Sequence, residues 1–239
     1  WGPYLLRQVY IQIPIYQQKR FEISNIFWSR CYEPWRIRRD KKIKKHFNDQ
    51  NVNVNTFNGS LLWEPWNIAK KDGTPYKVFT PYYRKGCLNS DKPRMPLPAP
   101  SLSNLISIDN HDLKIEDLEL MPKHNWYNKM ISLWSPGEEG AHSKIEEFIS
   151  NGLNNYKEGR NFPSNQNVSQ LSPHLHFGEV SPNQVWYRAK TKEGKLGIKK
   201  DLDHFLSELG WREFSFNLLY HFPFLPKENL QTKFDNFPW

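Results

Sequence analysis

The sequence predicts an α/β remnant followed by an all-α domain, the chain being truncated at both ends. Strand and helix patterns alternate in residues 1–85, prolines crowd the early part of residues 86–134, and helical periodicity dominates residues 135–239. We therefore expect the C-terminal part of an α/β domain, then an interdomain linker, then the first half of a helical domain. Because the chain opens on Trp1 and closes on aromatic residues that need burial, we interpret it as a fragment.

The α/β part is predicted from three short patterns. "SNIFW" (24–28) is apolar enough for a short buried strand. Pro34 suits the first position of a helix, which "WRIRRDKKIKKHF" (35–47) would continue with a strongly basic surface. "NVNVNTF" (51–57) alternates Val with Asn, as a half-buried strand does. The order strand, helix, strand indicates an α/β unit.

The linker is predicted from its prolines. "DKPRMPLPAPSLSNL" (91–105) holds four Pro, and Pro interrupts both helices and central strands. We expect this segment to run over the surface of the protein.

The helical part is marked by capping signals and apolar stripes. "SPGE" (135–138) and "SPNQ" (181–184) each place Ser at a cap, Pro at the first helical position and Glu or Gln at the third, which predicts two capping boxes. Residues 201–222 form the longest amphipathic run. Apolar residues at helical spacing are expected to face the core: Ile145, Phe148, Ile149, Leu153, Leu202, Phe205, Leu209, Phe216 and Leu219.

One face of the 201–222 helix is neither an ordinary core nor an ordinary surface. Trp211, Arg212 and Ser215 lie three, four and seven residues after Glu208, so the four residues share a stripe. A carboxylate, a flat ring and a guanidinium do not make an ordinary core, and Trp is a poor choice for a solvent-exposed face. One interpretation is a face that packs against a neighbouring helix through ion pairs.

Composition favours a polyanionic partner without proving one. The net charge is +8, and ten Trp, eleven Tyr and fifteen Phe accompany the basic residues, a mixture that suits stacking on bases or on a flat cofactor. Biased codon usage in a Lys- and Asn-rich chain explains the charge equally well, and any core uses aromatic residues. Cys31 and Cys87 form no disulfide framework, and no apolar run reaches membrane-spanning length.

Most familiar catalytic motifs are absent. The chain contains no glycine-rich nucleotide loop and no Cys/His spacing typical of zinc, so no metal is expected, although His174 and His176 would share a face if they lay on a strand. "VSQLS" (168–172) offers hydroxyls and backbone N–H groups to a phosphate; a simple helix cap is the more common meaning of such a turn.

Four segments resemble the DNA photolyase and cryptochrome family: "WSRCYEPWRIRRDKKIK" (28–44), "GTPYKVFTPYYRKGC" (73–87), "NFPSNQNVSQLSPHLHFGEVSPNQVW" (161–186) and "SELGWREF" (207–214). The resemblance extends over most of residues 24–239 and is greatest to the class I cyclobutane pyrimidine dimer photolyases of bacteria. It implies a Rossmann-like N-terminal domain with an antenna chromophore, a folate or a deazaflavin, and a helical domain that binds FAD.

The resemblance also assigns site residues. The segment around the FAD phosphates matches 168–172, although Val168 replaces the family's usual Thr, and Phe205 occupies a flavin-contacting position often held by Trp. Arg160 matches a contact to the DNA backbone, and Glu208 and Trp211 match contacts to the lesion. Trp239 matches the outer member of an electron relay. The full set of cofactor candidates is Tyr156, Val168, Ser169, Gln170, Leu171, Ser172, Phe205 and Arg212, and Arg212 is also a candidate for DNA contact.

The resemblance implies light-driven repair of pyrimidine dimers in damaged DNA, with an electron supplied by excited reduced FAD. We expect a monomer in the bacterial cytoplasm, associated with the nucleoid through DNA, and we expect the 239-residue chain by itself to be inactive. One alternative is a cryptochrome, which is a photoreceptor that binds FAD without repairing DNA. Another is a nucleic-acid-binding module that does not use light.

Overall fold

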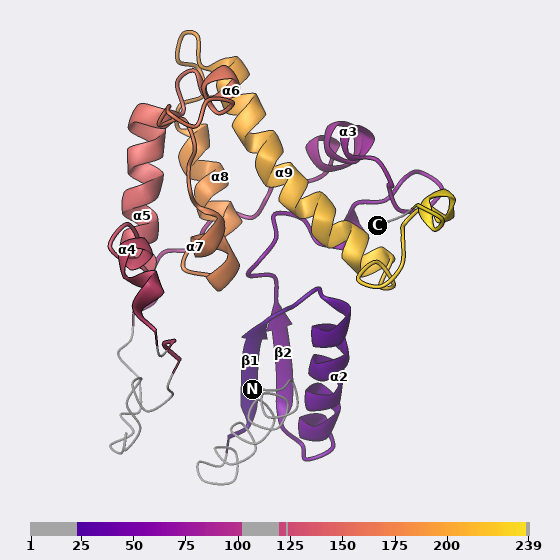
Figure 1. The fold of residues 1–239 in the computed structure, drawn as a ribbon. Helices are drawn as coiled ribbons and strands as arrows, with labels where there is room; N and C mark the ends of the chain where they lie inside the picture. The colour runs from indigo at the N-terminus through magenta and orange to yellow at the C-terminus, as the bar shows by residue number, and fades with distance from the viewer. Residues whose placement is uncertain (1–22, 102–119, 123, 238–239) are drawn as a thin grey trace, which may run out of the picture.

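The computed structural model describes residues 23–101, 120–122 and 124–237. Trp239, the expected relay residue, lies outside the described residues. Figure 1 shows a small α/β unit at one end and a group of helices at the other, which confirms the predicted order of an α/β part and a helical part.

The α/β unit consists of two parallel strands joined by a helix. Strand β1 (Asn25–Ser29) pairs with β2 (Asn53–Phe57). In their register Asn25 lies opposite Asn53, and Ser29 lies opposite Phe57. Helix α2 (Pro34–Asn48) connects them and begins at the predicted proline. Its small core contains Phe47, Val52 and Val54.

The prediction of a buried first strand is wrong. Side chains along β1 alternate between exposed and half-buried, and Phe27 is 62% exposed. Phe27 stacks on Phe57 of β2, with 6.3 Å between ring centroids. Within the described residues the sheet has only these two strands, and α2 packs on one face of it, so the ring pair on the other face stays in contact with solvent.

The helical part is built from short helices around one long one. Helix α9 (Lys199–His221) runs diagonally across the upper half of Figure 1, with α5 and α8 on one side and α3 on the other. The remaining helices are α3 (Phe79–Pro81), α4 (Asn128–Ile131), α5 (Glu138–Glu147), α6 (Tyr156–Gly159), α7 (Ser172–Phe177) and α8 (Pro182–Lys190). Wider π-type turns continue two of them, α3 at Tyr82–Gly86 and α5 at Phe148–Gly152. Short 3-10 turns lie at Pro65–Asn67, Cys87–Asn89, Asn125–Tyr127 and Thr232–Phe234.

The two predicted capping boxes have opposite outcomes. At α8, the backbone N–H of Gln184 donates to Ser181 Oγ at 3.2 Å and that of Ser181 donates to Gln184 Oε1 at 2.8 Å, which confirms the box. At α5 the helix begins later, after Gly137 with φ of 95°, and no side chain caps it. The Ser135 carbonyl instead packs closely against Gly140, where a Cβ would lie 1.7 Å from its oxygen.

The main hydrophobic core combines the helices with an earlier segment of the chain. The predicted stripe Ile145, Phe148, Ile149 and Leu153 is buried in it. Leu62, Trp63, Ile68, Tyr82, Tyr83 and Cys87 pack into the same core. The segment before residue 85 thus contributes to the packing of the helices, while the division of the chain at residues 85 and 134 stays a prediction.

The linker is extended where it is described. Residues 91–101 have no regular secondary structure. Two side chains of α8 hold the segment: Tyr187 Oη donates to the Pro93 carbonyl at 2.5 Å, and Asn183 Nδ2 donates to the Arg94 carbonyl at 2.7 Å. These bonds fix the backbone of a segment whose prolines supply few N–H donors of their own.

Candidate functional site

The centre of the candidate site is an ion pair between two helices. Arg160 Nη1, directly after α6, lies 2.6 Å from Oε1 of Glu208 on α9. The same Arg160 nitrogen donates to Tyr156 Oη at 3.2 Å, and His204 Nε2 lies 3.7 Å from the Glu208 carboxylate. The bond to Glu208 is the main cause that raises the pKa of Arg160. Three of the predicted site residues, Tyr156, Arg160 and Glu208, therefore meet.

Asp201 explains why α6 reaches α9. Its carboxylate, in the first turn of α9, accepts the backbone N–H groups of Asn155 at 2.9 Å and Lys157 at 2.8 Å. Asn155 has φ of 61°, a conformation that Asn adopts more readily than most residues. The carboxylate thus caps the start of α6 and fixes Arg160 beside Glu208.

Trp211 lies one turn along α9 from Glu208 and is 46% exposed. One face of its indole ring is covered by Phe79 of α3, with 3.8 Å between ring centroids and 10° between ring planes. Such an exposed Trp is available for stacking on a flat ligand, and it shares the helix face with Glu208 as the spacing predicted.

Arg212 does not act with Glu208. Its Nη1 donates to the Ser60 carbonyl at 2.6 Å and lies 3.3 Å from Glu213 Oε1, and its guanidinium sits over the Phe216 ring at 4.9 Å. Burial is the main cause that lowers the pKa of Arg212. Contacts within the protein therefore occupy much of this side chain, which is a candidate for cofactor and DNA contact.

Glu213 is a buried carboxylate that the sequence did not single out. It is fully buried, and its Oε2 accepts the backbone N–H groups of Leu62 at 2.8 Å and Trp63 at 3.2 Å. Burial raises the pKa of this carboxyl to about 7. The sequence did contain a signal for a buried carboxylate. Glu213 lies four residues after Leu209 and three before Phe216, which places a charged residue on the stripe expected to be apolar.

The predicted cofactor loop, residues 168–172, is held in place by Asn167. Its Nδ2 donates to the carbonyls of Gly152 at 2.8 Å and Asn154 at 2.9 Å. A Cβ on Gly159 would lie 2.1 Å from Asn167 Oδ1, so a glycine is required for this close approach. The loop is thereby fixed next to the segment that carries Tyr156.

The loop exposes polar groups. Gln170 has φ of 53°, and within the described part of the chain the backbone N–H groups of Val168, Ser169 and Gln170 donate no hydrogen bond. Ser172 is exposed at the start of α7, and Val168 is 49% exposed. Backbone donors and hydroxyls exposed in one turn are suited to a phosphate.

Three other cofactor candidates are buried. Tyr156, Leu171 and Phe205 are 6%, 3% and 3% exposed. Phe205 packs against Phe148 and Tyr156, with ring centroids 4.6 Å and 5.4 Å away. In this structure these side chains form the wall behind the site and have little surface to offer a ligand. Burial raises the pKa of Tyr156 to about 12, so its hydroxyl stays protonated.

The two histidines of residues 174 and 176 lie in different environments. His174 and His176 lie on helix α7 rather than on a strand, so they do not share a face. His174 is buried, with Nδ1 2.5 Å from Glu179 Oε2, whereas His176 is exposed.

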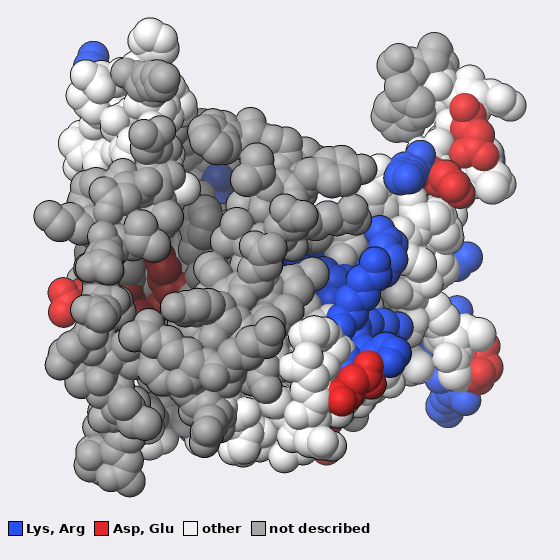
Figure 2. Space-filling view, turned by 90° about the horizontal axis from the view of Figure 1, so that it is seen from below, with Lys and Arg blue, Asp and Glu red and all other residues white. Residues whose placement is uncertain are grey.

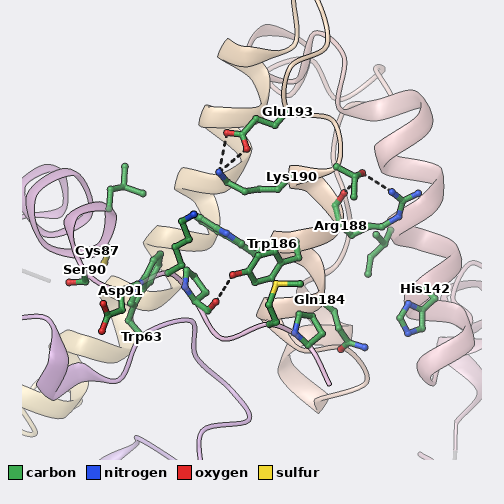
Figure 3. Close-up of a pocket in the computed structure, with 18 of the residues that line it drawn as sticks. Trp63, Cys87, Ser90, Asp91, His142, Gln184, Trp186, Arg188, Lys190 and Glu193 are labelled. Atoms are coloured by element: carbon green, nitrogen blue, oxygen red, sulfur yellow. Dashed lines mark hydrogen bonds and ion pairs between the residues drawn. The ribbon is translucent and has the colours of Figure 1, made fainter. Parts of the chain in front are cut away.

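A separate cavity of about 870 Å³ lies between the linker and helices α5 and α8. Figure 3 shows Trp63, Trp186 and Gln184 in its lining and Lys190 paired with Glu193 at 3.0 Å. None of the predicted site residues that the structure describes lines it. Its position beside the linker distinguishes it from the face of α9.

Positive charge gathers on the α/β unit. Helix α2 carries exposed Arg38, Lys41, Lys42, Lys44 and Lys45. Figure 2 shows Lys and Arg side chains grouped on the lower face of the molecule, the end at which the α/β unit lies. No helix within the described ranges combines the length and the apolar character needed to cross a bilayer.

Comparisons with known proteins agree with this architecture. Residues 15–101 match the family model for DNA photolyase. A deoxyribodipyrimidine photo-lyase of Agrobacterium fabrum is 37% identical over 90% of the chain, and Cryptochrome-2 of Arabidopsis thaliana is 29% identical over 90%. A solved bacterial class III photolyase from Agrobacterium tumefaciens covers 95% of the chain with a TM-score of 0.88 and 35% identity.

The chain is similar to members of the DNA photolyase and cryptochrome family along most of its length. It spans 45% of the length of the A. fabrum relative, 37% of the Arabidopsis relative and 47% of the solved A. tumefaciens chain. The solved relative is described as a class III photolyase, whereas the sequence motifs suggested class I.

Proposed function

We propose that the protein carrying this chain repairs cyclobutane pyrimidine dimers in DNA by light-driven electron transfer. One observation carries the proposal: Glu208 and the exposed ring of Trp211 lie on the same face of α9. Arg160 holds the Glu208 carboxylate there by an ion pair. The A. fabrum relative, which carries the name of a photo-lyase, supports it.

The face suits a pyrimidine pair turned out of the duplex. Enzymes that act on a base take it out of the stack, and such a base is read by stacking and by hydrogen bonds to its edge. Trp211 offers an aromatic surface for the stacking contact, and Glu208 offers carboxylate oxygens to N–H groups of the base edge. Arg160 holds the Glu208 carboxylate in position, and its side chain is 30% exposed, so it can also reach a nearby phosphate.

The residues present fit part of a binding site for FAD. The exposed turn at residues 168–172 has backbone donors and hydroxyls suited to the phosphates, even though Val168 lacks the hydroxyl that the family usually has. When bound and reduced, FAD supplies the electron on excitation by light. The chain's own residues orient the lesion and stabilise charge near it. We also propose a second antenna chromophore, a folate or a deazaflavin, in the α/β domain.

The proposal is tested with Trp211→Ala in the full-length protein. Binding to an oligonucleotide with one thymine dimer should weaken much more than binding to the same undamaged oligonucleotide, and repair under blue light should fall. Trp126→Ala, at another exposed Trp in a 3-10 turn, is the matched control and should change neither. An equal loss on both DNAs with Trp211→Ala contradicts the lesion contact.

A cryptochrome is the second candidate, and the similarity to the Arabidopsis cryptochrome favours it. One assay discriminates between the two functions, because binding of FAD by the full-length protein without repair of dimers under light favours the photoreceptor.

A further inference from the structure

The exposed Trp211 is the outermost member of a stack of three aromatic rings. Phe79 lies parallel to Trp211 at 3.8 Å between centroids, and it lies parallel to Tyr83 at 5.6 Å with 8° between planes. Tyr83 is only 1% exposed, Phe79 is half-buried, and Trp211 is 46% exposed. The stack therefore runs from the hydrophobic core to the surface of the candidate site.

The inner end of the stack is fixed by close packing. Gly210, the residue before Trp211, lies against Tyr83, and a Cβ at this position would be 2.5 Å from the Tyr83 ring. Tyr83 is buried in a closely packed core, and α9 approaches its ring this closely because residue 210 is a glycine. Phe79 and Tyr83 lie one helical turn apart on α3 and its π-type extension, which places both rings on the same side.

A fourth ring limits the sideways movement of Trp211. Phe214, which is 6% exposed, meets Phe79 edge-on at 6.0 Å and Trp211 edge-on at 6.0 Å. The indole is thus held by a parallel ring on one face and by an edge contact from its own helix. Parallel and edge-on aromatic pairs each have a preferred geometry, so together they restrict the ring to one orientation.

We propose that Phe79 is a positioning residue for lesion recognition: it backs one face of Trp211 and thereby presents the opposite face of the indole to the flipped pyrimidine dimer. The effect of Phe79 on lesion binding rests on the proposed function, whereas its effect on the orientation of the Trp211 ring does not. A stacking surface that is already ordered loses less conformational freedom when a base binds, which increases affinity for the lesion without a new contact to it.

The variant that tests the proposal is Phe79→Ala in the full-length protein. Phe79→Tyr is the matched control, because it keeps a flat ring in the stack. Phe177→Ala is a second control, because it removes a phenylalanine that is 75% exposed on α7. Melting temperatures of all variants identify any general loss of stability.

The first measurement follows the ring without DNA. Protein labelled with 5-fluorotryptophan gives a ¹⁹F resonance for Trp211, assigned by its disappearance in Trp211→Phe. In Phe79→Ala this resonance should shift, because the ring current of Phe79 is lost, and should show greater mobility in relaxation measurements. Phe79→Tyr and Phe177→Ala should leave its mobility unchanged. Unchanged mobility in Phe79→Ala overturns the positioning role.

The second measurement is the ratio of affinities for a dimer-containing and an undamaged oligonucleotide. Phe79→Ala should lower this ratio roughly three- to ten-fold, the range expected for one aromatic pair. Adding Phe79→Ala to Trp211→Ala should lower it no further, because Phe79 acts through Trp211. A purely structural role would weaken both affinities together and leave the ratio unchanged, which contradicts the proposal. If the wild-type protein shows no preference for the dimer, the proposed function fails, while the ¹⁹F comparison still decides whether Phe79 fixes the ring.

Discussion

Arg160 and Glu208 form the ion pair at the centre of the candidate site, with 2.6 Å between Nη1 and Oε1. Both side chains are about one-third exposed, so the pair lies at the surface where a ligand reaches it. Exposed pairs of this kind contribute little to stability, which suggests that its value lies in orienting the carboxylate.

Glu208→Gln should reduce lesion preference while the protein stays folded. The amide keeps the shape of the side chain but loses the charge that Arg160 holds and that strengthens hydrogen bonds to the base edge. Because hydrogen bonds to charged groups contribute about 1.5–3 kcal/mol, we expect a loss in affinity for dimer-containing DNA of about ten-fold or more. Fluorescence anisotropy with damaged and undamaged oligonucleotides measures it. Glu158→Gln, an exposed carboxylate on α6 with a looser partner in Lys200 at 3.4 Å, is the control and should have little effect.

Glu213 should make stability depend on pH. Its pKa in the folded protein is about 7, above the ordinary value of 4.5, because burial disfavours the charged form. Between these two values the folded state binds more protons than the unfolded state. The free energy of unfolding should therefore fall as pH rises from about 4.5 to 7 and should level off above that range.

Glu213→Gln should remove this part of the pH dependence. Urea unfolding at several pH values between 5 and 8 measures the slope for both proteins. The variant should also be less stable at low pH, since its amide N–H₂ group would face the Arg212 guanidinium, a donor against a donor. Equal slopes in the wild type and the variant would show that another group titrates.

Gly210→Ala should destabilise the protein, because the new methyl group would lie 2.5 Å from the buried ring of Tyr83. Overpacking of this kind costs about 1–3 kcal/mol, more than the helix propensity of alanine returns. Chemical denaturation measures the change. Ser215→Ala, at an exposed site on the same helix, is the control and should stay within about 0.5 kcal/mol of the wild type. A Gly210→Ala protein that is as stable as the wild type would show that α9 or the ring moves easily.

Asn167→Ala should loosen the loop proposed to hold the FAD phosphates. The change removes two hydrogen bonds, to Gly152 and Asn154, which fix the loop beside α6. Limited proteolysis should cleave residues 161–170 faster, and the full-length protein should retain FAD several-fold less well, because the donors of the turn are no longer held in place. Asn165→Ala, two residues earlier and exposed, is the control. Faster cleavage with unchanged FAD retention would contradict the role of this loop in binding.

Local sequence patterns determined much of what is local in this protein. The parallel strands around α2, the helix start at Pro34, the capping box at Ser181 and the shared face of Glu208 and Trp211 depend on proline geometry, side-chain capping and helical periodicity, which act over a few residues. The motif at 207–214 also indicated a resemblance to the photolyase and cryptochrome family, and the comparisons confirm this resemblance.

Only the tertiary structure decided which partners these residues meet. Periodicity could not show that Arg160 pairs with Glu208, that Arg212 turns to Ser60, or that Phe79 covers one face of Trp211, because each contact joins segments far apart in the chain. The capping box expected at Ser135 failed within its own turn, where the Ser135 carbonyl packs against Gly140 and the helix begins only after Gly137. Sequence determines which faces a helix has, and the balance of burial and hydrogen bonding across the whole core determines what each face touches.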